Sequence, residues 1–130
     1  MMREEILFYV KKEYGTTSEH LWKSNPEYEV LRHKLQPGEK KAKWYGLIMK
    51  VKRRTLGLEG EDDIDILNVK CNPDMLDLLR MSEGYLPAYH MNKSNWITIL
   101  LDGTVPLENI KQLIHESYDM TAGTKVKKEH

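Results

Sequence analysis

The ten residues KWYGLIMKVK (43–52) decide the fold, because their side chains alternate with the period of two that is typical of a β-strand. One face of this predicted strand is apolar and carries Tyr45, Leu47, Met49 and Val51. The other face carries Trp44, Gly46, Ile48, Lys50 and Lys52. This second face is therefore expected to be apolar at one end of the strand and wet at the other.

Four further strands are predicted from alternation or from short apolar runs: Tyr28–His33, Ile66–Cys71, Tyr85–Met91 and Trp96–Leu101. The sequence Gln36-Pro37-Gly38 predicts a turn before the 43–52 strand. The last two strands are expected to form a hairpin closed by the four residues 92–95. Since the last strand is apolar on both faces apart from Thr98, it should be central or covered.

Helical spacing predicts a first helix over Arg3–Tyr14 and a last helix that opens at Pro106. The inward side of the last helix is expected to carry Ile110, Leu113, Ile114, Ser117 and Tyr118. A short helix should run through Leu21 and Trp22, and another should start at Pro73 and bury Met75, Leu78 and Leu79. Connections between neighbouring strands are too short for parallel crossovers. The predicted class is therefore α+β, a mostly antiparallel sheet of about five strands in the order helix–strands–helix–hairpin–helix.

The chain has 130 residues with 20 Lys and Arg against 20 Asp and Glu, so its formal net charge is zero. It is expected to form one domain over residues 1–123, with a helical extension at 1–24 and a flexible tail at 124–130. Its apolar runs are far shorter than the roughly 18 residues of a membrane span, and its early acids do not suit a targeting peptide. We expect a cytoplasmic monomer without membrane contact.

Motifs that carry catalysis or metal binding are missing from the sequence. The single cysteine, Cys71, excludes an internal disulfide framework and a multi-cysteine zinc site. The five histidines form no HExxH pair, and the acidic run 59–65 lacks EF-hand spacing. No catalytic residue, metal or cofactor is predicted, so an enzyme is disfavoured. A pocket near Tyr89, His90 and Tyr118 is the alternative that would reverse this expectation.

Charge is segregated along the chain although its total is zero. Nine basic residues and one acid lie between Arg32 and Arg54, a net +8, and the remainder carries 11 basic and 19 acidic residues, a net −8. The functional interpretation is a positive edge that grips phosphates. The structural one is a set of lysines that protects an exposed strand and loop from aggregation. The acids of residues 59–65 could also neutralise Lys50 to Arg54 within the fold.

The stretch PAYHMNKSNW (87–96) has the densest group of unusual residue types. Its aromatic rings could stack on bases while Lys93 holds a phosphate. Alternatively, the hairpin needs these residues itself, because Asn92 tolerates turn geometry, His90 can hydrogen-bond a carbonyl, and Tyr89 and Trp96 fill the core. The structural interpretation is favoured for the histidine and the tryptophan, and the two interpretations are balanced for Asn92 and Lys93.

The segments PAYHMNKSNWITILLDG (87–103) and VPLENIKQLIHESYD (105–119) closely resemble the C-terminal half of the MmcQ/YjbR-like family of small bacterial proteins. NVKCNPDMLDLLR (68–80) is similar to its middle segment, and LRHKLQPGEKKAKWYGLIMKV (31–51) to its early strand pair. The resemblance implies an α+β, frataxin-like arrangement described as a double wing, and it suggests DNA binding. The residues that match the family pattern, none with a demonstrated catalytic role, are Pro87, Tyr89, His90, Asn92, Lys93, Trp96, Ser117 and Tyr118.

The leading hypothesis is a DNA-binding module that holds the phosphates of double-stranded DNA. Its expected contacts are Lys40, Lys41, Lys43, Lys50, Lys52, Arg53, Arg54 and Lys93. The alternative is a protein-interaction or regulatory domain that receives an acidic protein partner without binding nucleic acid. Exposed aromatic residues would then be its anchors, namely Trp22, Trp44 or Tyr45.

Overall fold

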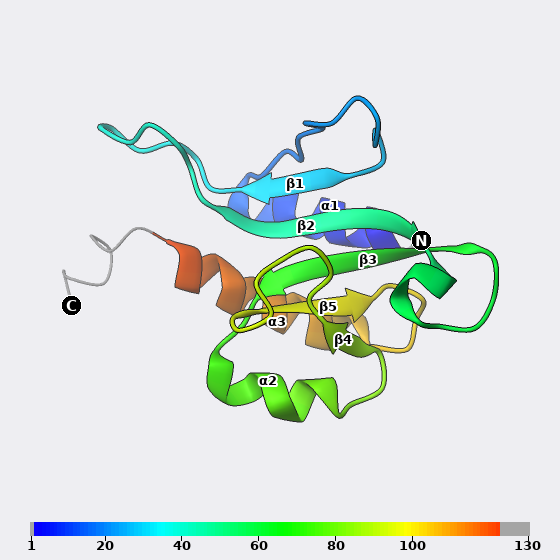
Figure 1. Cartoon of the computed structure of the whole chain (residues 1–130). Coiled ribbons are helices and arrows are strands. Elements are labelled where there is room, and N and C mark those ends of the chain that lie inside the picture. The colour runs from blue at the N-terminus through cyan, green and yellow to red at the C-terminus, as the bar shows by residue number, and fades with distance from the viewer. Residues whose placement is uncertain (1, 123–130) are drawn as a thin grey trace.

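The computed structural model describes residues 2–122 as one five-stranded antiparallel sheet with helices against it (Figure 1). In chain order, the elements are α1 (Met2–Tyr14), β1 (Glu29–Arg32), β2 (Trp44–Lys52), the 3-10 helix η1 (Arg53–Leu56), β3 (Asp63–Lys70), α2 (Pro73–Arg80), β4 (Tyr85–Pro87), β5 (Trp96–Leu100) and α3 (Leu107–Thr121). The strand order is β1-β2-β3-β5-β4. The α+β prediction is confirmed, and β5 is central as its two apolar faces predict. The tail predicted at 124–130 lies outside the described residues.

Apolar side chains cover both faces of the sheet. On the helix face, Ile6 and Val10 of α1 and Ile110 and Ile114 of α3 are completely buried against the strands. The opposite face is covered by side chains from loops and short elements, which are Trp22, Tyr28, Leu56, Leu58, Tyr89 and Met91. We call this second face the loop face. The first helix, predicted as part of an extension, therefore contributes directly to the core.

A β-bulge at Tyr45 interrupts the alternation predicted for β2. The register of β1 against β2 skips this residue, since Leu31 pairs with Gly46 and Arg32 pairs with Trp44. Tyr45 consequently packs on the helix face, opposite the other three apolar residues that were predicted to share its side of the strand. That prediction was wrong at one position because an extra residue reverses the direction of the following side chains.

The hydroxyl of Ser117 on α3 bridges β2 and β3 at this bulge. Register pairs between the two strands end at Gly46 and Val69, one residue short of Tyr45 and Lys70. The Ser117 Oγ donates to the Tyr45 carbonyl at 2.6 Å and accepts the Lys70 N–H at 2.9 Å. This completely buried side chain therefore satisfies the two backbone groups that the bulge separates, and it fixes α3 to both strands.

Two of the predicted helical features differ in the structure. Residues 15–28 contain no helix through Leu21 and Trp22, because the backbone of Glu19 instead pairs with Val30 at the edge of the sheet. Both backbone hydrogen bonds of this bridge form, at 3.0 and 2.9 Å. In α2, Leu76 is buried and Leu79 packs against the core in a partly buried position, as predicted for Leu79, whereas Met75 and Leu78 are exposed.

The predicted hairpin has a longer loop than the sequence indicated. Its first strand, β4, ends at Pro87, so eight residues rather than four separate it from β5. Tyr89 does not continue the strand because its backbone N–H donates to the Thr98 side chain at 2.9 Å. We call residues 88–95 the motif loop.

Replacing Ser117 by alanine should destabilise the protein by about 1–3 kcal/mol, since two buried backbone groups lose their partner. Urea unfolding followed by circular dichroism measures this as a lower midpoint with an unchanged slope. Ser94→Ala is the matched control, because Ser94 is exposed and only its backbone N–H is used. An unchanged midpoint for Ser117→Ala would contradict the bridging role of the hydroxyl.

Candidate nucleic-acid interface

The connection between β1 and β2 extends beyond the sheet as a narrow arm (Figure 1). The backbone N–H of His33 donates to the Lys43 carbonyl at 2.9 Å and closes the base of the arm. Glu39 N–H donates to the Gln36 carbonyl at 3.0 Å, and Gly38 has a φ of 86°. Pro37 followed by a glycine in the left-handed region is typical of a type II turn, so the turn predicted here is confirmed. We call residues 34–43 the Lys loop.

The Lys loop carries four lysines and one glutamate, a net charge of +3. All four lysines are exposed, and none lies within ion-pair distance of a carboxylate in residues 2–122. The carboxylate of Glu39 is engaged inside the loop, where it accepts the Gln36 N–H at 2.8 Å. The positive charge predicted for Lys40, Lys41 and Lys43 is therefore gathered on one projecting element.

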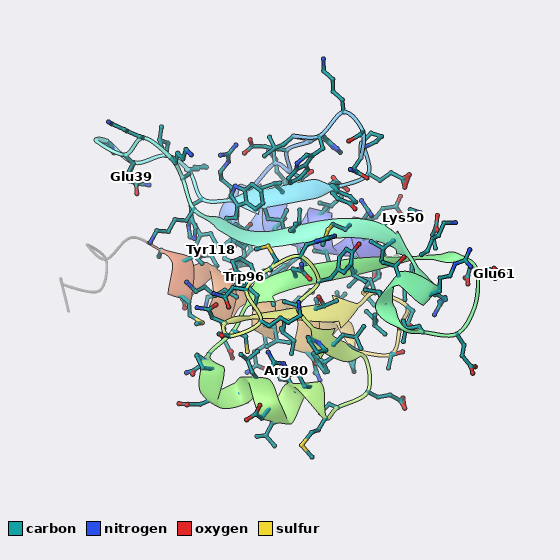
Figure 2. The ribbon with its side chains drawn as sticks, in the orientation of Figure 1. Glu39, Lys50, Glu61, Arg80, Trp96 and Tyr118 are labelled. Atoms are coloured by element: carbon teal, nitrogen blue, oxygen red, sulfur yellow. The ribbon has the colours of Figure 1, made fainter. Side chains whose placement is uncertain are left out.

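The basic residues at the other end of β2 lie beside carboxylates. Arg53 Nε is 3.1 Å from Asp62, and an Arg54 nitrogen is 3.8 Å from Glu61. Lys50 Nζ lies 3.9 Å from carboxylate oxygens of both Glu27 and Asp65. Figure 2 shows Lys50 and Glu61 at the opposite end of the sheet from Glu39 of the Lys loop. The neutralisation by residues 59–65 that the sequence left open thus occurs for both arginines.

Lys52 and Lys93 complete the predicted basic set. Lys52 is exposed and pairs in register with Asp63, next to the arginines. Lys93 is exposed on the motif loop, three residues before β5 begins. Since β2 and β5 both run antiparallel to β3, they begin at the same end of the sheet. Lys93 therefore lies at the end from which the Lys loop projects, two strands away.

Two buried polar side chains hold the motif loop in place. Asn68 Nδ2 donates to the Tyr89 carbonyl at 2.8 Å, and Thr98 Oγ1 accepts the Tyr89 N–H. Thr98 in turn donates to Asn68 Oδ1 at 2.5 Å, which closes the network. Both side chains are completely buried in adjacent central strands, so the backbone of Tyr89 is fixed from below.

The rest of the motif loop is shaped by local contacts. His90 adopts a φ of 60°, in the left-handed region, and its ring lies 4.0 Å from that of Tyr89. Asn92 Oδ1 accepts the Ser94 N–H at 2.8 Å, the turn role predicted for it. The Arg80 guanidinium of α2 donates to the Lys93 carbonyl. These contacts support the structural interpretation of the loop, while the Lys93 side chain faces solvent.

A cluster of rings lies beneath the base of the Lys loop. Tyr118 of α3 stacks on Tyr14 of α1 with centroids 4.1 Å apart, and the His33 ring lies 4.2 Å from Tyr118. His33 Nε2 contacts Thr121 Oγ1 at 2.8 Å. Because the Thr121 hydroxyl donates to the Ser117 carbonyl, the histidine is the donor in this contact. Burial lowers the pKa of His33 and favours its neutral form.

Two alternatives were considered from the sequence, a protein-interaction surface with aromatic anchors and a pocket near Tyr89 and Tyr118. The structure does not bring the residues of either one together at the surface. Tyr45 is completely buried and donates to Thr16 Oγ1 at 2.6 Å, while Trp22 and Trp44 are half-buried against each other on the loop face. The expectation of an exposed aromatic anchor was therefore wrong for Tyr45, whereas Trp22 and Trp44 keep part of their surface accessible. Tyr89 packs on the loop face and Tyr118 on the helix face, so the pocket imagined between them does not form.

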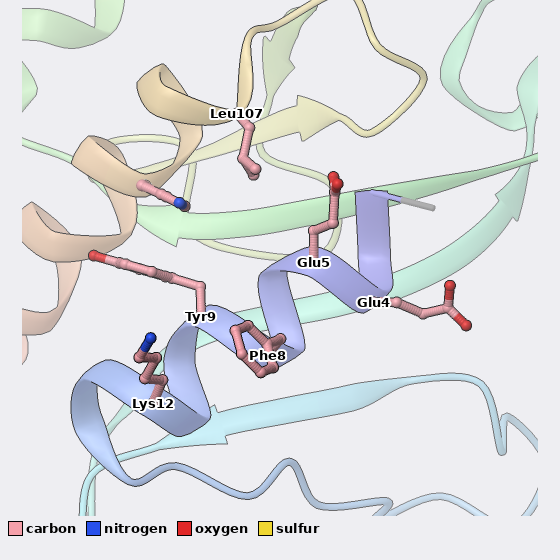
Figure 3. A pocket seen from close by; sticks show the side chains of 7 residues that line it. Glu4, Glu5, Phe8, Tyr9, Lys12 and Leu107 are labelled. Carbon is pink, nitrogen blue, oxygen red and sulfur yellow. The ribbon is translucent and has the colours of Figure 1, made fainter.

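Sequence reasoning missed a hollow of about 440 Å³ on the outer side of the two long helices. Figure 3 shows Phe8 and Tyr9 of α1 and Leu107 of α3 around it. Lys111 Nζ lies 5.2 Å from the centre of the Tyr9 ring, a cation–π distance. The hollow has exposed side chains of both charges on its rim and no buried polar group pointing into it, which gives no preference for one ligand class.

Residues 2–122 contain no group of three His, Cys, Asp or Glu side chains that could hold a metal ion. The thiol of Cys71 is buried, and burial raises its pKa, as suits a core residue. None of the helices in this part of the chain is long and apolar enough to cross a bilayer.

The element order and the clamped motif loop define a small α+β domain built on one antiparallel sheet. The chain belongs to the YjbR family, whose profile matches residues 12–120. It is 46% identical over 121 residues to the Bacillus subtilis protein YyaQ, covering 93% of this chain and 98% of that one. It is also 36% identical over 53 residues to Escherichia coli YjbR, covering 40% of this chain and 45% of that one. Both relatives are named as uncharacterized proteins.

Solved structures agree with this assignment. The crystal structure of a Pseudomonas syringae protein superposes with a TM-score of 0.86 at 36% identity, covering 94% of this chain and all of that chain. A Deinococcus radiodurans protein with a DUF419 domain superposes with a TM-score of 0.66 at 26% identity, covering 88% of this chain and 75% of that chain. The family resemblance found in the sequence is thus confirmed for the fold.

Replacing Thr98 by valine should loosen the motif loop, because the Tyr89 N–H and the Asn68 side chain both lose a buried partner. We expect a stability loss of about 1–3 kcal/mol and amide exchange at Tyr89 at least about tenfold faster. Hydrogen exchange followed by NMR measures the second effect. Thr104→Val, at an exposed threonine, is the control, and equal Tyr89 exchange rates in the two variants would refute the clamp.

Replacing His33 by glutamine should reduce the acid sensitivity of the fold. The pKa of His33 lies below its ordinary value of 6.5 in the folded state, so below pH 6.5 the unfolded chain binds more protons. Its contribution is fully present above pH 6.5 and is lost as the pH falls below that value. Urea unfolding at pH 7.5 and pH 5 should show a smaller loss for His33→Gln than for the wild type. Equal losses would show that this histidine does not titrate with unfolding.

Proposed function

We propose that the protein binds a polyanion, double-stranded DNA, through the Lys loop, and that Lys93 adds a contact from the motif loop. The observation that supports DNA binding through the Lys loop is the division of the basic residues between the two ends of β2. Lys40, Lys41 and Lys43 are exposed on a projecting arm and have no carboxylate partner in residues 2–122. A phosphate that approaches them displaces only water and counterions, whereas at Arg53 and Arg54 it competes with a neighbouring carboxylate.

The shape of the arm also supports this proposal. A narrow turn with Pro37 and Gly38 at its tip can enter a groove of a duplex, and its lysines then lie beside both phosphate chains. Lysine is a point charge without the planar fork of arginine, so binding should depend little on base sequence. This proposal assigns the protein a binding function rather than catalysis.

Binding to a 20-base-pair duplex, measured by fluorescence anisotropy, should weaken steeply as salt increases. Three or four phosphate contacts correspond to a slope of about −3 for log affinity against log salt. The triple variant Lys40→Glu/Lys41→Glu/Lys43→Glu should lower the affinity by roughly two orders of magnitude at 50 mM salt. Absence of binding at 50 mM salt, or a slope near zero, would rule the proposal out.

The matched control reverses charge at the other end of β2. Lys50→Glu/Arg53→Glu/Arg54→Glu changes the net charge by the same amount but alters residues that lie beside carboxylates. It should lower the affinity by much less than the Lys-loop variant. Equal losses would mean that only the total charge matters and that the Lys loop has no special role.

A further inference from the structure

Half of the exposed large apolar side chains lie on one surface of the protein. Six large apolar residues are exposed in residues 2–122, and three of them follow one another on α2 and the turn after it. Their exposed fractions are 44% for Met75, 63% for Leu78 and 84% for Met81. A fourth, Leu35, is 58% exposed and lies on the Lys loop. Single exposed apolar residues are ordinary, but three along one short helix form a patch.

This patch on α2 is acidic as well as apolar. Because Leu76 points inward, helical geometry places Asp74 and Asp77 on the solvent side among the exposed apolar residues. The Asp77 side chain is 96% exposed and only 4.0 Å from Arg80, whose guanidinium donates to the motif loop. We call these five residues the α2 stripe: Asp74, Met75, Asp77, Leu78 and Met81.

The Lys loop is complementary to the α2 stripe in both respects. It offers one exposed leucine between lysines, with a net charge of +3, whereas the stripe offers apolar side chains between two aspartates. In one molecule the Lys loop and α2 lie toward opposite edges of the sheet (Figure 1), so they can meet only between two copies. We propose that the Lys loop of one copy docks on the α2 stripe of a second copy.

This contact joins two different surfaces, so it is heterologous and leaves a free stripe and a free Lys loop on the pair. Further copies can therefore add head to tail. The surface involved is a short helix and one loop, smaller than a standard interface, so we expect association only at high concentration and low salt. The proposal holds whether or not the Lys loop also binds DNA; if it does, the two partners compete for the same lysines.

Sedimentation equilibrium at about 0.5 mM protein and low salt tests the contact. The wild type should show an average mass above that of the monomer that falls as salt is added. Leu78→Glu, which alters the stripe, and Lys40→Glu/Lys41→Glu, which alters the loop, should each remain monomeric. Phe8→Glu changes an exposed apolar residue elsewhere and is the control that should associate like the wild type.

Mixing the two defective variants gives the decisive result. The Leu78→Glu chain keeps an intact Lys loop and the loop variant keeps an intact stripe, so an equimolar mixture should form a dimer and nothing larger. A wild type that stays monomeric, association of Leu78→Glu alone, or a mixture that stays monomeric would overturn the proposal. Since Leu78→Glu keeps every lysine of the loop, its DNA affinity reports on the proposed function separately.

Discussion

The hydroxyl group of Ser117 joins β2 and β3 at the point where the hydrogen bonds between these two strands end. The bulge at Tyr45 separates one carbonyl of β2 from one N–H of β3, and Ser117 of α3 contacts both. Buried backbone groups without partners are costly, so this serine stabilises the bulge. The same bulge turns Tyr45 toward the helices, where Tyr118 and His33 pack against its ring. The position of the ring cluster therefore depends on the same hydroxyl group.

That ring cluster connects the core to the projecting arm. His33 begins the connection between β1 and β2, and its side chain is held by α3 while its backbone closes the base of the Lys loop. The arm therefore extends from a fixed base, and its lysines lie beyond ion-pair distance of the carboxylates in residues 2–122. At the other end of β2, acids of the following turn lie beside the two arginines. The lysines at the start of β2 thus have no carboxylate partner in residues 2–122, whereas the two arginines after its end lie beside carboxylates.

The strands and the outer helices could be predicted from the sequence because alternation and helical spacing record which side chains are buried. The bulge could not be predicted, because the sequence of β2 alternates as it would in an uninterrupted strand. Only the pairing of β2 with β1 reveals the extra residue. The side of α2 that packs inward was predicted only in part, since Leu79 packs against the core as expected but Leu76 is buried in place of Met75 and Leu78. Residues 15–24 lack a helix because an edge bridge uses the Glu19 backbone. The helix or strand propensity of a segment gives no information about its pairing with a distant part of the chain.

For the candidate site, sequence identified the charged residues but not which of them have partners. Charge segregation along the chain was evident. The separation of Glu39 of the Lys loop from Lys50 (Figure 2) and the contact of Asp62 with Arg53 arise only in the folded sheet. In the motif loop, too, some features follow from neighbouring residues and others depend on residues far away in the sequence. Its turn at Asn92 follows from residue type, whereas its attachment to the sheet depends on Asn68 and Thr98.

The attachment of the motif loop has an evolutionary consequence. Positions 68 and 98 form one hydrogen-bonded unit with the backbone of position 89, so a change at either buried position alone leaves unmatched polar atoms in the interior. Substitutions at positions 68 and 98 should therefore occur together. Homologues should either retain both polar residues or replace both by apolar residues. A homologue in which only one has changed should have rebuilt the loop above it, and a loop transplanted between family members would need both supporting residues to keep its shape.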